Sequence, residues 1–175
     1  MRFSAMISVL ALAAAPSAWA APRFSSHPKI AAIEAAIVRD GPPATVRRLF
    51  DQGRWDEVSG HIARGEPGWV ALGGKLAPGT DAGTAEDLAI SLAFALPRDA
   101  PAVLAVLDAG AADVADVCGA PFIEGTVRDV PAYVRRATAA VARVTARSLA
   151  ATRAACLDAL AKARCAGRAP GRRPF

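Results

Sequence analysis

The sequence contains few of the residues from which catalytic and metal sites are usually built. Its 175 residues include only two histidines and one tyrosine, and aromatic residues make up 6% of the chain. A zinc site needs several ligands at fixed spacing, which His27 and His61 do not supply. Walker A, G-x-G-x-x-G, H-E-x-x-H and G-x-S-x-G motifs do not occur. We therefore expect a protein that is not an enzyme and that holds no metal and no other cofactor.

Long apolar runs are missing too, except in residues 1–20. There Arg2 supplies a positive charge, an apolar core follows from Ala5 to Ala15, and Ala18-Trp19-Ala20 gives a small-x-small site. This order is typical of a secretory signal peptide, and the core is too short to span a bilayer. A buried N-terminal helix is the alternative interpretation. A signal peptide predicts cleavage after Ala20, a periplasmic or secreted location, and no transmembrane anchor in the remaining chain.

Cysteine is scarce, with Cys118, Cys156 and Cys165 only. In an oxidising compartment we expect one disulfide. Cys156 and Cys165 are on opposite faces of a helical run, so Cys118 must pair with one of them. We favour Cys156, because it lies within the apolar pattern beside Leu157 and Leu160, whereas Cys165 lies near the end of the run. Since no C-x-x-C pair occurs, a catalytic or metal-binding role for these thiols is disfavoured.

Alanine-rich helical patterns make up most of the remaining chain. Apolar residues recur at helical spacing in short stretches that Pro, Gly and Asp separate, and after Pro131 neither Gly nor Pro occurs before Gly167. We predict an all-α fold: an irregular bundle of about six to eight short helices with a long C-terminal helix or helix pair. A short α-solenoid of the HEAT or TPR kind is the alternative, although no fixed repeat period is found. Residues 21–165 would form a single domain and residues 166–175 a disordered basic tail.

The densest apolar sequence lies in residues 69–107, and its middle part predicts a central helix. The alternating apolar residues in 88–96 would also suit a strand, but the alanines among them and Pro97 after them favour a helix. Thr84 is the expected N-cap, and the acidic pair Glu86-Asp87 would then lie in the first turn, where negative charge is favourable. We expect this helix to be buried on most sides.

The next helix has the clearest boundaries in the sequence. Asp99 is the expected N-cap, Pro101 lies in the first turn, and Gly110 follows the last apolar residue.

The turn before the central helix, residues 79–84, is one candidate contact surface. Backbone N–H groups at a helix N-terminus can hold an anion, and Thr84 would stand at that position. The charge of Asp81 would oppose an anion there, so a turn with a helix cap is the simpler interpretation. Asp81 and Thr84 are nevertheless candidate binding residues.

The charges are unevenly distributed along the chain. Residues 131–175 hold ten Lys or Arg and one acid, whereas residues 21–130 hold ten Lys or Arg and fifteen Asp or Glu. If the C-terminal run is one helix, its arginines lie opposite its apolar residues. A solvated face is the simplest explanation, and an anionic envelope surface or an acidic protein partner are the functional ones. Nucleic acid is not expected, because no aromatic residues lie between the arginines. The candidate binding residues here are Arg135, Arg136, Arg143 and Arg147.

Two strings, PGTDAGTAEDLAISLAFALPR at 78–98 and VCGAPFIE at 117–124, resemble sequences of small exported helical proteins of Gram-negative bacteria, a group with no assigned activity. The resemblance extends from Trp69 to Leu160. It implies an exported, mostly helical protein and supports the pairing of Cys118 with Cys156. It carries over no catalytic residue.

These observations predict a non-catalytic, disulfide-stapled helical module in the periplasm that binds a protein partner in the cell envelope. An inhibitor or immunity-type role would suit its size and compartment, by analogy alone. The alternative is a protein that binds an envelope polymer or an anionic membrane surface through its basic C-terminal helix. An enzyme with an acidic residue such as Asp81 or Glu124 in a cleft is a third hypothesis.

Overall fold

A computed structural model describes residues 29–122 and 127–166 of the chain. Within those ranges the regular structure is entirely helical, which confirms the predicted all-α fold. The predicted signal peptide, Glu124 and the predicted basic tail beyond residue 166 lie outside the described residues. The helices are α1 (Ile30–Asp40), α2 (Pro42–Asp51), α3 (Trp55–Ala63), α4 (Trp69–Leu76), α5 (Ala82–Ala95), α6 (Ala100–Asp108), α7 (Val114–Cys118), α8 (Val130–Ala142) and α9 (Ala150–Ala166), with two 3-10 turns, η1 (Ala77–Gly79) and η2 (Arg147–Leu149).

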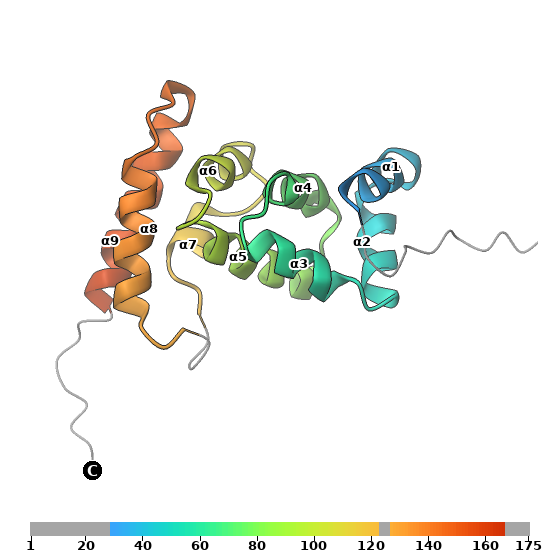
Figure 1. The fold of residues 1–175 in the computed structure, drawn as a ribbon, viewed down its shortest axis with the longest axis horizontal. Coiled ribbons are helices and arrows are strands. Elements are labelled where there is room, and N and C mark those ends of the chain that lie inside the picture. Colours follow the sequence, from blue (N-terminus) through green and yellow to red (C-terminus); the bar gives the residue numbers. More distant parts are fainter. Residues whose placement is uncertain (1–28, 123–126, 167–175) are drawn as a thin grey trace, which may run out of the picture.

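The helices form two layers, so that helices two apart along much of the chain lie side by side (Figure 1). In one layer α3 packs against α5, α5 against α7, and α7 against α9. In the other, α1 packs against α4, α4 against α6, and α6 against α8. The helices of the predicted bundle are therefore arranged in layers. Within a layer, most helices pack against the helix two places along the chain, as they do in the α-solenoid that was the alternative prediction.

The core lies between the two layers and is built largely from aliphatic side chains. Each fully buried aliphatic side chain stabilises the fold by roughly 1.5–3 kcal/mol. The glycines of α4 let neighbouring helices approach closely, because a Cβ at Gly73 would lie 3.1 Å from Ile62 Cδ1 and one at Gly74 would lie 3.1 Å from Val106 Cγ2. Side chains without exposed surface include Ile33, Leu49, Val58, Ile62, Leu76, Leu92, Leu96, Val103 and Leu104.

The central helix α5 begins earlier than the sequence predicts. Asp81 is the N-cap: its carboxylate accepts a hydrogen bond from the Thr84 backbone N–H at 3.1 Å, and the Thr84 hydroxyl accepts one from the Asp81 N–H at 2.9 Å. The prediction that Thr84 is the N-cap is wrong, because aspartate caps better than threonine and the box also forms with threonine at the third helical position. Glu86 and Asp87 consequently lie outside the first turn, so their predicted role there is wrong as well.

One face of α5 is open. The helix contacts α3 and α7 in its own layer and α4 and α6 in the other. Leu88 and Leu92 are buried, but between Ala82 and Asp87 only Thr84 is. Burial on most sides is thus confirmed for the C-terminal half of α5 and is wrong for its N-terminal half.

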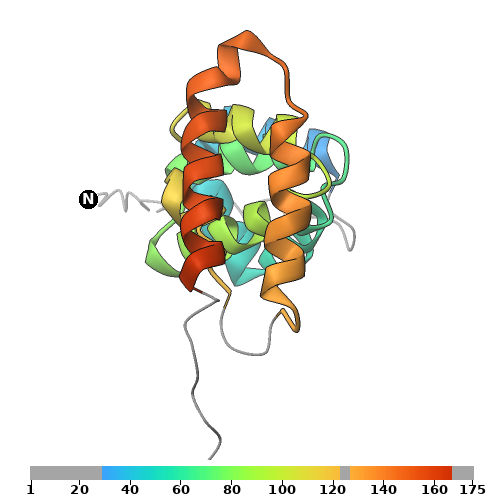
Figure 2. The same cartoon turned by 90° about the vertical axis from the view of Figure 1, so that its left-hand side faces the viewer.

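The chain after residue 127 folds back on itself as a pair of helices, α8 and α9, that lie side by side (Figure 2). The helix-pair option is therefore correct and the single helix is wrong. One helix over residues 131–166 would be about 54 Å long and would carry Cys156 and Leu160 away from the layers. Folding back buries both of these side chains completely.

A disulfide joins Cys118 in α7 to Cys156 in α9, as predicted, with Cα atoms 5.3 Å apart. Both cysteines are fully buried, whereas Cys165 is free and exposed. The bond closes a loop with a sequence separation of 38 and, in the chain-entropy view, stabilises the fold by about 4 kcal/mol. It also fixes the position of α7, which has only five residues.

Candidate functional site

The turn at residues 79–84 separates two hollows in the surface. The larger hollow, of about 470 Å³, lies between α5 and α7, and Thr80 and Ala82 of the turn line it. The smaller, of about 260 Å³, lies between α2 and the turn, with Asp81 and Thr84 in its lining. The larger volume is in the range of small-molecule and side-chain binding sites. This larger hollow, formed by residues 80–90 on one side and 111–121 on the other, is the α5–α7 groove.

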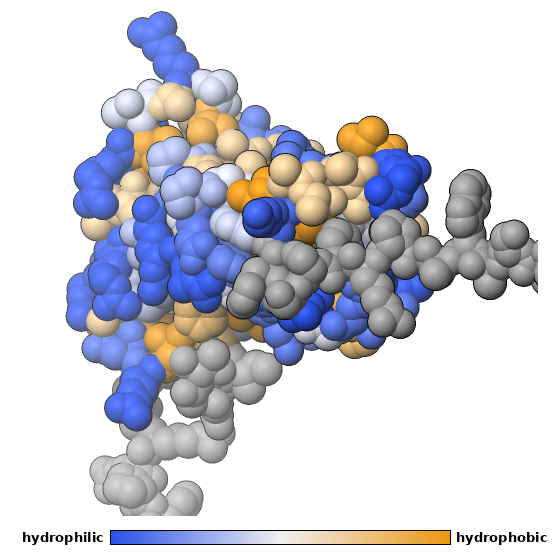
Figure 3. Space-filling model, turned by 45° about the vertical axis from the view of Figure 1, so that its right-hand side comes forward, coloured by the Kyte–Doolittle hydropathy of each residue, from blue (hydrophilic) through white to orange (hydrophobic). Residues whose placement is uncertain are grey.

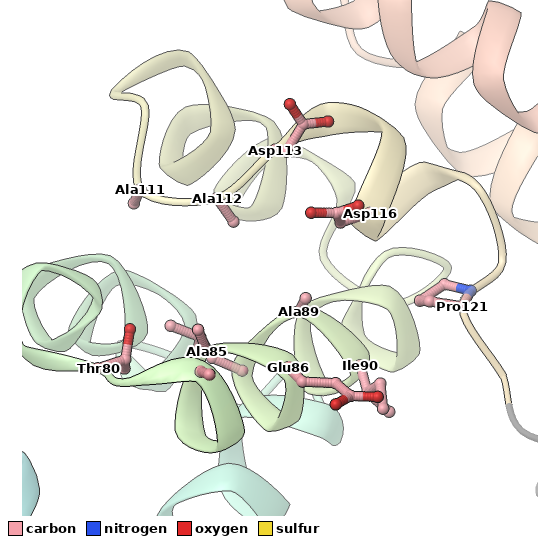
Figure 4. A pocket seen from close by; sticks show the side chains of 12 residues that line it. Thr80, Ala85, Glu86, Ala89, Ile90, Ala111, Ala112, Asp113, Asp116 and Pro121 are labelled. Carbon is pink, nitrogen blue, oxygen red and sulfur yellow. The ribbon is translucent and has the colours of Figure 1, made fainter.

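Small apolar side chains line most of the α5–α7 groove. Figure 4 shows α5 forming one wall, with the connection from α6 and the helix α7 opposite. Because an alanine methyl group occupies little space, these walls leave room between the helices that larger side chains would fill. Leu88, Ile90 and Pro121 add further apolar surface. The alanines are Ala82, Ala85 and Ala89 on the α5 side and Ala111 and Ala112 opposite.

Three carboxylates also line the groove, and its described lining residues include no Lys, Arg or His. Asp113 is the N-cap of α7, where its Oδ1 accepts a hydrogen bond from the Ala115 N–H at 2.6 Å. Glu86 and Asp116 are exposed and have no hydrogen-bond or ion-pair partner within the described ranges. Asp116 projects from α7 over the α5 wall (Figure 4). Among the described residues, no basic side chain pairs with Glu86 or Asp116, so the groove carries negative charge.

The neighbouring acid Asp87 has a different environment. Its carboxylate accepts a hydrogen bond from the Trp55 Nε1–H at 3.2 Å, which joins α5 to α3. Glu86 and Asp87 are therefore adjacent in sequence but serve different surfaces, as expected for consecutive positions on a helix.

Asp81 and Thr84, two of the predicted binding residues, are joined to each other in the α5 cap. Hydrogen bonds from the Thr84 hydroxyl, and then from its backbone N–H, lower the pKa of Asp81 below its ordinary value. The carboxylate therefore stays ionised and occupies the position that an anion would take at this helix N-terminus. Any binding role of these two residues stays a prediction.

The smaller hollow borders the same cap and combines apolar with charged side chains. Phe50 of α2 lines it and is 61% exposed, an unusual position for a large aromatic side chain. Arg47 and Asp51 lie beside it in the lining.

The four predicted arginines lie on α8 and in the connection to α9. Arg135, Arg136 and Arg143 are exposed and fall within about 100° of one another around the α8 axis. Arg147 is exposed in η2. None of the four side chains has a hydrogen-bond or ion-pair partner in the part of the chain that the structure describes. Arg153, by contrast, is half-buried and donates to the Val144 carbonyl at 2.5 Å, so the single arginine face expected along one helix is not formed.

The surface view shows strongly apolar side chains in small separate groups between hydrophilic ones (Figure 3). Among the helices of residues 29–122 and 127–166, none has both the length and the apolar character that crossing a membrane requires. The same ranges contain no group of three or more His, Cys, Asp or Glu placed to hold a metal ion.

The groove carboxylates Glu86, Asp113 and Asp116 were not among the predicted site residues. One sequence feature could have indicated half of the site: the small residues Ala82, Ala85 and Ala89 recur on one helix face where a buried helix would have large apolar ones. That pattern does not show which distant segment lies opposite.

Comparison with known proteins assigns no family: no family model, no curated protein and no solved structure matches this chain.

Proposed function

We propose that the protein is exported and acts in the periplasm, or outside the cell, as a non-catalytic, disulfide-stapled helical module that binds a protein partner of the cell envelope. The α5–α7 groove is the observation that carries this proposal. Its apolar walls offer contact area, and its unpaired carboxylates offer directional polar groups, which is the usual composition of a binding site.

The disulfide supports the proposal because it holds one wall of the groove in place. A helix of five residues such as α7 is not stable alone. The bond from Cys118 to Cys156 and the complete burial of Val117 anchor it to the rest of the fold. A wall that is ordered before binding reduces the entropy that binding costs. A structural disulfide also suits the oxidising compartment that export would provide.

The test is site-specific photo-cross-linking in cells that express the full chain. Ala115, exposed on α7 next to the groove residue Asp116 but not itself in the lining, is replaced by p-benzoylphenylalanine, and a control variant carries the same residue at the exposed Ala35 of α1. We expect one discrete cross-linked protein from position 115 and none from position 35. We also expect the recovered chain to be in the periplasm or medium and to begin at Ala21. A chain that remains cytoplasmic, or that cross-links at neither position, would overturn the proposal.

An inhibitor or immunity-type role is a narrower form of this proposal and rests on size and compartment by analogy. For such a role, the cross-linked protein should be a hydrolase or toxin whose activity falls when the complex forms. If the complex leaves that activity unchanged, the inhibitor or immunity-type role is wrong.

A second candidate function is binding to an envelope polymer or an anionic membrane surface. It is favoured by the exposed arginines Arg135, Arg136, Arg143 and Arg147, which lack partners within the described residues. It predicts co-sedimentation with anionic vesicles that weakens as salt is raised, and loss of binding in an Arg135/Arg143/Arg147→Glu variant. Binding that salt does not affect would contradict it.

A further inference from the structure

The α5–α7 groove combines apolar walls with carboxylates, and one type of side chain can contact both. Its walls are mainly alanine, and its charged groups come from opposite sides, Glu86 from α5 and Asp116 from α7 (Figure 4). Lysine and arginine side chains match this combination of apolar walls and negative charge, because each has a long aliphatic stem that ends in a positive charge. A shorter or purely apolar side chain would leave the carboxylates without a partner.

We propose that the α5–α7 groove binds a segment of the protein partner that presents one lysine or arginine side chain between small residues. This inference rests on the proposed function and adds the chemistry of the partner. The stem lies along the alanines, and the charged head donates hydrogen bonds to the carboxylate of Glu86 on one wall or of Asp116 on the other. Small flanking residues allow the backbone of the segment to come near the groove, whose lining includes Thr80 and Ala112.

The charge of the groove decides against other occupants. An anionic polymer or lipid headgroup would be repelled, because the groove has three carboxylates and its described lining has no basic side chain. A metal ion is not favoured as the occupant either, since no group of three or more His, Cys, Asp or Glu side chains that could hold one is found among the described residues. A second copy of this chain could also supply a cation, from Arg143 or Arg147. Sedimentation of the free protein, without peptide, distinguishes binding of a second copy from binding of a partner segment.

The direct test is an NMR titration of the 15N-labelled, oxidised protein with the peptide acetyl-Ala-Ala-Arg-Ala-Ala-amide. We expect the amide signals of residues 85–90 and 111–116 to shift, and the lysine version of the peptide to shift the same signals. Replacing arginine by citrulline keeps the shape of the side chain and removes its charge, so we expect binding about tenfold weaker. Binding of the arginine peptide should also weaken as salt is raised.

Two groove variants test the two parts of the site separately. Glu86→Gln with Asp116→Asn removes the charges and should weaken binding of the arginine peptide about tenfold. Ala85→Leu fills part of the groove without changing its charge and should weaken the arginine and citrulline peptides alike. The matched control, Asp56→Asn with Asp158→Asn, makes the same change in net charge on exposed residues outside the groove and should bind as the wild type does. Circular dichroism checks that each variant is folded.

Several results would overturn the inference. Equal binding of the arginine and citrulline peptides, or shifts confined to α8, would show that the groove does not select a cation. Sedimentation of the free protein should show a monomer. Salt-sensitive self-association that Arg143→Glu with Arg147→Glu abolishes would make a second copy the occupant. If the cross-link at position 115 forms but the arginine peptide does not bind, this chemistry is wrong while the proposed function stands.

Discussion

The hydroxyl of Tyr133 on α8 donates a hydrogen bond to the backbone carbonyl of Ala93 on α5 across 2.8 Å, in the buried interior. In a continuing helix that carbonyl would accept from residue 97, but Pro97 has no N–H. The Leu96 N–H reaches the same carbonyl only at 3.3 Å. Tyr133 therefore supplies a donor that the proline cannot, and it ties the C-terminal helix pair to the central helix.

Tyr133→Phe should destabilise the protein by about 1–2 kcal/mol, because the Ala93 carbonyl stays buried with only its longer bond. Urea unfolding followed by circular dichroism measures this. In a Pro97→Ala background, where residue 97 again has an N–H, the same substitution should cost less. Equal costs in the two backgrounds would contradict the role given to Pro97.

Stability should fall as the pH rises above about 10. Burial raises the pKa of Tyr133 above its ordinary value of 10.0. In the unfolded chain the phenol loses its proton near pH 10, whereas the folded chain keeps it, so the folded state binds more protons there and loses stability with rising pH. Tyr133 is the only tyrosine, so tyrosinate absorbance near 295 nm follows this group. We expect that absorbance to rise together with unfolding. Ionisation near pH 10 with an unchanged circular dichroism spectrum would contradict the prediction.

Removing the disulfide by Cys118→Ala with Cys156→Ala should lower the free energy of unfolding by about 4 kcal/mol. Chemical denaturation with and without reductant gives the same comparison for the wild type. Cys165→Ser is the control, because Cys165 is exposed and unbonded, and it should unfold as the wild type does. A large effect of Cys165→Ser would instead show that this thiol has a structural role.

The ionised carboxylate of Asp81 in the α5 cap should stabilise the protein, and this stabilisation should be lost at low pH. Since Thr84 lowers the pKa of Asp81, the charged cap favours the folded state above the ordinary pKa of aspartate, and this contribution is lost as the pH falls through the lower, folded value. The melting temperatures of the wild type and Asp81→Ala should therefore converge at low pH. Asp81→Asn keeps a good N-cap without the charge, so its difference from Asp81→Ala should not change with pH.

Gly79→Ala should destabilise the protein by about 1–3 kcal/mol through overpacking. A Cβ at Gly79 would overlap the backbone carbonyl group of Pro42, so η1 would have to move away from the start of α2. Gly83→Ala is the matched control four residues on, where the nearest atom to a new Cβ is 4.0 Å away. It should be neutral or slightly stabilising, because alanine favours the helix. Thermal unfolding of the two variants side by side decides this.

Helix boundaries with local signals were predicted well. Asp99 caps α6 by accepting from the Ala102 N–H at 3.2 Å, with Pro101 in the first turn, and Gly110 follows the helix with φ of 73°. These signals act over three or four residues through one hydrogen bond or one dihedral angle, so they can be read from the chain directly. Asp81 and Thr84 are both residues that favour the N-cap position. In the sequence, only the greater capping strength of aspartate distinguishes them.

Features that depend on distant contacts were predicted less well. No Gly or Pro marks the end of α8, so nothing local distinguished one long helix from two. The turn between α8 and α9 follows from burial of Cys156 and Leu160 against the rest of the fold, together with the disulfide to α7. The predicted arginine face depended on a continuous helix and was lost with it.

Composition and local pattern alone determined the all-α class and most helix positions, because helical periodicity and chain punctuation act within a few residues. For the disulfide, the local pattern only favoured Cys156 over Cys165 as the partner of Cys118. The layered packing, the return of α9 and the placing of Glu86 and Asp116 on opposite walls of the α5–α7 groove were decided only in three dimensions. Their physical cause is the burial of side chains from separate helices against one another, and that depends on which surfaces meet rather than on any neighbour in the sequence.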